Sequence, residues 1–195
     1  MVYCLRNSTG AWSARAVWQQ DSYNESDNGS VIFEFLDAGG QQIGPKYDSN
    51  RRAPLHWTAR EFRAAVPPLT RSIRLKLRAY RTNGTENSGY FDDIALSLVR
   101  NDDALTRLAL SVVNGDAETN DTGGWTLESG NFKVRDSNNP APVQGVHYFT
   151  GGAAASTSAY QDLALSAGQL GNCGDSVLSR LWITRKGLKF LSDRG

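Results

Sequence analysis

Basic side chains recur at every second position of one short segment of the chain. This cationic row consists of Arg74, Lys76 and Arg78, and a segment expected on a neighbouring strand adds Arg60 and Arg63. Side chains at alternate positions of a strand share one face, so the row could line a groove for an acidic glycan. The alternative is a solvated sheet face with Glu34 and Glu61 as cross-strand partners. Because the chain has 21 basic and 20 acidic residues, the sequence favours the solvated face.

Aromatic rings offer a second kind of chemistry, because a sugar can stack its C–H face on a ring that is exposed at one side. The candidate ligand-binding residues, including two arginines of the row, are Trp57, Tyr23, Tyr148, Arg74 and Arg78. The other tryptophans are expected in the core. Trp125 follows Gly-Gly at the start of an expected strand, and Trp12 and Trp18 share the parity of one strand.

The chain lacks the familiar catalytic motifs. His56 and His147 are far apart in sequence, and neither stands in a nucleophile or metal-binding motif. There is no Gly-x-Ser-x-Gly, phosphate loop or dinucleotide fingerprint. A glycosidase-like carboxylate pair depends on a separation across a cleft, which a sequence does not give. We therefore expect a protein that is not an enzyme, with a jelly-roll hydrolase as the least favoured alternative.

The segments that must position these residues alternate between apolar and polar side chains. Residues 73–80 give the clearest pattern, with apolar residues at the odd positions and polar ones at the even positions. Period two predicts half-buried strands. Further strands are expected at 31–35, 90–99 and 108–113, and shorter ones at 12–18, 57–66, 124–127, 132–135, 146–150, 156–163 and 179–183. Turns are expected at 27–29, 39–40, 83–84, 123–124 and 151–152. Short strands separated by Gly and Asn turns, without a long amphipathic helix, predict an all-β sandwich or barrel.

Composition excludes some classes of protein. A net charge of +1 disfavours nucleic acid as a partner, because phosphate binding requires a cationic excess. No apolar run approaches the roughly 20 residues of a membrane helix, and the first residues do not read as a signal peptide. Cys4 and Cys173 are either two free thiols or a disulfide that ties the chain ends together.

One motif in the second half of the chain suggests a family. The stretch 112–135 begins with Val-Val at the end of an apolar strand. It continues with Asn-Gly-Asp-Ala-Glu and reaches Gly-Gly-Trp a few residues later. It resembles the opening of calcium-containing galactose-binding-like domains, which include many bacterial carbohydrate-binding modules, and 147–165 resembles the continuation. The closing strand of that family reads aromatic-x-Asp-Asp-aliphatic, and residues 90–94 match it. In this chain the closing strand precedes the opening one.

The resemblance implies an antiparallel β-sandwich of the jelly-roll type in circularly permuted order. We expect one permuted sandwich over residues 1–165, with 1–100 as the second half of the family's domain and 107–165 as the first. The tail, 166–195, reads as a partial repeat of the opening strands, because LKFLSDRG near its end resembles FEFLDAGG at 33–40. Permutation requires that the strands joined by the link 100–106 be neighbours. The alternative is a slice through a tandem array, which would pair with other copies by strand exchange.

The same resemblance implies a structural calcium ion that joins the first strand of the family's domain to its last. Calcium takes six to eight oxygen ligands from carboxylates, carbonyls and water. Glu118 and one of Asp92 or Asp93 would supply carboxylates, with further oxygens from Asn114 and Asp116 in the turn. By strand parity, Asp92 is expected on the side of Ile94. The alternative is that the turn carboxylates are only solvated.

The sequence thus leads to two expectations about function. The first is a non-catalytic module that binds carbohydrate or a glycoprotein surface, stabilised by calcium, in an extracellular or cell-surface protein. The second is a structural or adhesive repeat unit of a surface protein that forms a homo-oligomer by strand exchange.

Overall fold

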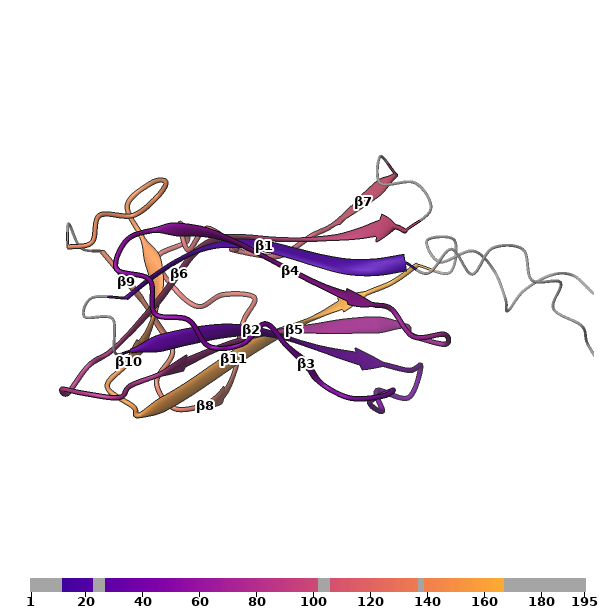
Figure 1. The fold of residues 1–195 in the computed structure, drawn as a ribbon, viewed down its shortest axis with the longest axis horizontal. Helices are drawn as coiled ribbons and strands as arrows, with labels where there is room; N and C mark the ends of the chain where they lie inside the picture. Colours follow the sequence, from indigo (N-terminus) through magenta and orange to yellow (C-terminus); the bar gives the residue numbers. More distant parts are fainter. Residues whose placement is uncertain (1–11, 23–26, 102–105, 137–138, 167–195) are drawn as a thin grey trace, which may run out of the picture.

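The structure is a computed structural model that describes residues 12–22, 27–101, 106–136 and 139–166. Regular structure in these residues consists of strands alone, arranged as two packed antiparallel sheets (Figure 1). The predicted all-β sandwich is therefore confirmed, whereas jelly-roll connectivity and circular permutation stay predictions. Five expected features lie outside the described residues: Cys4, Tyr23, Cys173, the strand at 179–183 and, beyond its first residue, the partial repeat at 166–195.

The first sheet has the strand order β4-β1-β6-β10-β9, with β7 also paired to β6. Its strands are β1 (Trp12–Ser22), β4 (Thr58–Ala65), β6 (Asn87–Arg100), β7 (Arg107–Leu110), β9 (Lys133–Arg135) and β10 (Tyr148–Gly152). One edge of β6 follows β1 along its whole length. The opposite edge is divided, because β10 pairs near the start of β6 and β7 pairs near its end.

The second sheet has the order β3-β2-β5-β11-β8. Its strands are β2 (Asn28–Leu36), β3 (Tyr47–Asp48), β5 (Ser72–Tyr80), β8 (Thr126–Ser129) and β11 (Ser156–Ala164). The central strand β5 has the alternation read from the sequence, with Ile73, Leu75, Leu77 and Ala79 fully buried. The sequence did not predict β3, since its two residues are too few for a period to show.

The core lies between the two sheets and is rich in aromatic rings. Trp18 and Trp125 are buried in it and Trp12 packs against it, as predicted.

Two predicted turns are wrong. Asp27-Asn-Gly is not a turn, because Asn28 and Gly29 already belong to β2. The glycine serves packing here: a Cβ on Gly29 would lie 2.5 Å from Cζ of Phe91. The Gly-Gly pair at 151–152 likewise belongs to the end of β10.

The two halves of the chain meet where β7 lies antiparallel beside β6. Leu110 is opposite Leu96, and Leu108 is opposite Leu98. Beyond β7, the N–H of Ile94 donates to the carbonyl of Gly115 over 2.9 Å. The expected contact between the strand that ends the first hundred residues and the strand that opens the remainder is thus present within one chain.

A bulge in β6 changes which side chains face the core. Val17 is opposite Ala95 but Gln19 is opposite Asp92, so β6 has one extra residue here. Asp93 takes up the irregularity with φ of 49°. As a result Phe91 and Ile94 both belong to the core, three positions apart. The prediction that Asp92 shares the side of Ile94 is therefore wrong, because strict alternation does not continue through the bulge.

The contact between Gly115 and β6 leaves no room for a side chain. A Cβ at residue 115 would overlap the carbonyl oxygen of Ile94. We expect Gly115→Ala to lower the free energy of unfolding by about 2–3 kcal/mol, since backbone atoms must move apart. Urea unfolding followed by tryptophan fluorescence measures this change. Gly39→Ala is the matched control, because its Cβ would have only an ordinary contact, 3.4 Å from Asp37. Equal effects of the two substitutions would show that the close approach of Gly115 and β6 does not exist in solution.

Candidate functional site

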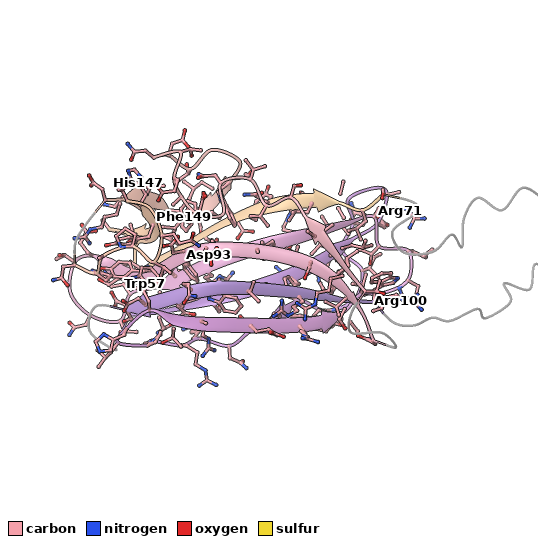
Figure 2. All side chains as sticks on the ribbon, turned by 90° about the horizontal axis from the view of Figure 1, so that it is seen from above. Trp57, Arg71, Asp93, Arg100, His147 and Phe149 are labelled. Carbon is pink, nitrogen blue, oxygen red and sulfur yellow. The ribbon has the colours of Figure 1, made fainter. Side chains whose placement is uncertain are left out.

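The segment 139–147, which leads into β10, connects several of the predicted site residues. Its backbone N–H groups donate to the carboxylates of Asp92 and Glu118, and its Ala141 carbonyl accepts a hydrogen bond from Trp57. Figure 2 shows Trp57, His147 and Phe149 near the same end of the molecule, opposite the end that bears Arg71 and Arg100. This loop therefore links the two predicted carboxylates to the predicted aromatic residue.

Asp92 is one of its two anchors. The residue is fully buried, and its Oδ2 accepts hydrogen bonds from the N–H groups of Val143, at 2.9 Å, and Gln144, at 3.5 Å. Its Oδ1 accepts a third from the N–H of Asp93 at 2.7 Å. Burial raises the pKa of Asp92 to about 6, and these three hydrogen bonds only partly counteract it. The carboxylate is thus a buried anion held by backbone donors.

Glu118 is the second anchor, and it accepts hydrogen bonds from the same loop a few residues further on. Its Oε1 accepts hydrogen bonds from the N–H of Val146, at 3.0 Å, and of His147, at 2.9 Å. The loop approaches so closely that a Cβ on Gly145 would overlap the Glu118 carboxyl group. Asp92 from β6 and Glu118 from the turn after β7 therefore hold one loop between them.

The other predicted metal ligands have local partners in the structure. Asn114 accepts from the N–H of Thr119 and donates to the carbonyl of Asp121. Asp116 Oδ1 accepts from the N–H of Glu118 at 3.3 Å, within the same turn. Asp93 is half-buried at the bulge of β6. The contacts of Asn114 and Asp116 shape the turn that presents Glu118. The sequence motif alone does not distinguish such a turn from one that binds a metal.

Asp92 and Glu118 supply carboxylate oxygens, which are one kind of ligand that calcium takes. The two carboxylates hold one loop, whose backbone carbonyls are further oxygen donors of the kind calcium takes. Among the described residues, no lysine or arginine forms a salt bridge with Asp92, so its buried carboxylate lacks a counter-ion there. The same part of the chain contains no group of three or more His, Cys, Asp or Glu side chains placed to hold a metal. A calcium ion here would therefore depend on carbonyl and water oxygens beside two carboxylates.

Three aromatic rings pack edge to face on the outer face of the first sheet. Trp57 meets Tyr148 edge to face, with ring centroids 5.6 Å apart, and Tyr148 meets Tyr90 in the same manner at 5.0 Å. Trp57 is half-buried, whereas Tyr148 is fully buried. The prediction that Tyr148 is exposed is therefore wrong. Its face of the sheet is covered by Trp57, from a segment about ninety residues away in the chain.

The indole of Trp57 is fixed at this surface. Its Nε1 donates to the carbonyl of Ala141 over 2.6 Å, and its ring rests on Tyr148. Ala141, which accepts this hydrogen bond, belongs to the loop that Asp92 and Glu118 hold. The position of the tryptophan ring thus depends on the two carboxylates.

The cationic row is not a continuous groove. Arg60 and Arg63 lie on β4 in the first sheet, so they are not neighbours of Arg74 on β5 in the second, and that prediction is wrong. Alternation gives the face of a strand but not its neighbours. Arg63 instead pairs with Glu61.

Within the second sheet, the first two members of the row are neutralised by carboxylates. Arg74 makes two hydrogen bonds to Asp162, at 2.7 and 2.8 Å. Buried Lys76 contacts Glu34 at 2.9 Å and Glu128 at 2.7 Å. Burial raises the pKa of Glu34, but hydrogen bonds from Lys46 and Lys76 lower it by more, so the net shift is downward. The expected role of Glu34 as a cross-strand partner is confirmed.

Burial of Asp92 makes stability depend on pH. The pKa is 3.8 for the ordinary carboxyl group and about 6 in the fold, so between these values the unfolded chain loses a proton that the folded chain keeps. Stability from this group therefore falls as pH rises from about 4 to 6, by about 3 kcal/mol in total. Urea unfolding in chelator at several pH values measures the slope. Asp92→Asn should flatten it and the exposed-site variant Glu86→Gln should not, whereas an unchanged slope in Asp92→Asn would contradict the assignment.

No helix able to span a membrane occurs in the residues that the structure describes. Comparisons of the chain with protein-family models, with curated proteins and with solved structures gave no match.

Proposed function

We propose that this chain is a non-catalytic module that binds carbohydrate. The observation that carries the proposal is Trp57, a half-buried ring that is held in one position at the surface by Ala141 and Tyr148. A sugar stacks on such a ring through its apolar C–H face. Because the ring is already ordered, stacking loses little conformational entropy on binding.

The proposal includes a structural calcium ion at Asp92 and Glu118. When bound, the ion would supply the counter-charge that the buried Asp92 carboxylate lacks. The two side chains already hold the loop that carries Ala141, the hydrogen-bond acceptor of Trp57. Calcium would thus contribute to sugar binding indirectly, through the loop that orients the tryptophan.

Removal of the Trp57 ring tests the sugar-binding proposal. A glycan array identifies a ligand for the wild-type protein, and isothermal titration then measures its affinity. We expect Trp57→Ala to weaken binding about tenfold or more, since the stacking surface is lost. Trp57→Phe should retain part of the affinity, because it keeps a ring but loses the N–H group.

Leu55→Ala is the matched control for this experiment. Leu55 lies in the same segment and is 47% exposed, so its substitution removes an exposed apolar side chain without touching the ring. The affinity of the Leu55→Ala variant for the glycan should equal that of the wild type. Failure to bind any glycan, or full affinity in Trp57→Ala, would count against the proposed function.

Calcium is tested by thermal unfolding with added calcium and with chelator. A ligand that binds only the folded chain stabilises it, by about 2.7 kcal/mol at a hundredfold excess over Kd. We expect Tm to rise in calcium for the wild type but not for Glu118→Gln. The control variant Glu86→Gln, at an exposed site, should retain the rise. The same Tm in calcium and in chelator would rule out the ion.

A further inference from the structure

Two arginine side chains contact a single tyrosine on the second sheet. The guanidinium carbon of Arg51 lies 3.4 Å from the ring centroid of Tyr80, and that of Arg78 lies 5.7 Å from it. Arg78 also donates from Nη1 to the hydroxyl of Tyr80 over 2.9 Å. Two positive charges are thus collected around one aromatic ring.

The two arginines come from separate parts of the chain and are positioned by the backbone. Arg78 and Tyr80 project from the same face of β5, the face turned away from the core. Arg51 comes from the segment between β3 and β4. That segment is tied to the edge of β2, where the backbone groups of Arg52 and Gly29 exchange two hydrogen bonds of 3.0 and 3.1 Å. Arg51 is therefore held beside Tyr80 by sheet-like pairing.

The remaining cations of this face have carboxylate partners, but these two do not. Arg74 is paired with Asp162, and Lys76 is paired with Glu34 and Glu128. Within the described part of the chain, Arg51 and Arg78 make no salt bridge. Tyr80 offers these two cations its ring quadrupole and its hydroxyl oxygen, neither of which carries a net negative charge.

A further unpaired group lies beside this site. Ser30 on β2 stands directly opposite Arg78 on β5, on the same outward face. The residue is fully buried, and its Oγ has no hydrogen-bond partner. A buried hydroxyl without a partner is unfavourable. The structure therefore places two unneutralised cations and one unsatisfied hydroxyl side by side.

We propose that Arg51 and Arg78, which both contact Tyr80, bind one oxyanion group, a carboxylate or a sulfate, of an acidic saccharide. Guanidinium groups bind such groups with paired, charge-assisted hydrogen bonds. The saccharide part of this inference rests on the proposed function, whereas capture of the oxyanion does not. The site is separate from Trp57, because β5 belongs to the second sheet and Tyr148 beneath Trp57 belongs to the first.

The surrounding charges limit the ligand to a single anionic group in this place. Further along the same face lie the carboxylates of Glu34, Glu128 and Asp162. Because these carboxylates are paired with Lys46, Arg74 and Lys76, the rest of the described face has no excess of positive charge for a polyanion that follows the sheet. The balanced net charge of +1 acts in the same direction. A saccharide with isolated acidic groups fits this pattern better than a nucleic acid backbone does.

Isothermal titration at low ionic strength tests the proposal with five probes. They are a glucuronate-containing oligosaccharide, its carboxyl-reduced neutral form, a sulfated oligosaccharide, its desulfated form and inorganic sulfate. We expect the acidic probes to bind at least tenfold more tightly than their neutral forms, with affinity that falls as salt is added. The two acidic oligosaccharides show whether the site takes carboxylate, sulfate or both.

Variants then assign the binding to the two arginines. Arg51→Gln and Arg78→Gln should each weaken binding of the acidic probe about tenfold or more, and Arg78→Lys should restore only part of it. Arg74→Gln is the matched control, since Arg74 lies two residues away on the same face but is already paired. The control should bind like the wild type, and Tm values confirm that each variant is folded.

Each result bears on one of the two proposals. Loss of acidic binding in the Arg51 and Arg78 variants supports the oxyanion site, even if Trp57→Ala has no effect and the sugar-stacking proposal fails. Equal binding of acidic and neutral probes overturns the oxyanion site. Equal losses in Arg74→Gln and Arg78→Gln also overturn it, because the effect would then come from the general charge of the sheet.

Discussion

The edge of β6 that faces away from β1 is the constraint on which the rest of this molecule depends. β10 uses the first part of that edge and β7 uses the last part, and neither pairs with the residues at the bulge between them. Backbone groups of a buried strand need partners. The turn after β7 supplies one through the carbonyl of Gly115, which accepts from Ile94. The candidate site occupies the position where the edge of β6 passes from one partner strand to the other.

Irregular backbone near this position is satisfied by carboxylates in place of strands. The loop before β10 directs four of its N–H groups at Asp92 and Glu118. The same arrangement places two acidic side chains close to one short segment, and the burial of Asp92 raises its pKa to about 6 despite these hydrogen bonds. Hydrogen bonds that order this loop therefore bring together the two carboxylates that make the site a candidate for a cation.

Sequence reasoning succeeded where a residue's surroundings come from its own strand. The alternation of 73–80 predicted β5 and its buried face, and the core positions of Trp18 and Trp125 followed from local pattern. It failed where the surroundings come from elsewhere in the chain. Tyr148 is covered by Trp57, a contact between distant segments, and Asp92 changed sides because of an extra residue in β6. Arg51 carried no signal at all, since its position depends on how a loop pairs with the edge of β2.

The hydrogen bond from Trp57 to Ala141 joins residues that are 84 positions apart, one from each half of the chain. A ligand that needs the indole ring in its present place must therefore select molecules in which both halves have already come together. Recognition and closure are then thermodynamically linked, and occupancy of the ring acts as a clasp between the halves. In a chain whose halves could also associate with those of other copies, such a clasp would favour any closed pair of halves over an open one, whether the pair belongs to one chain or to two.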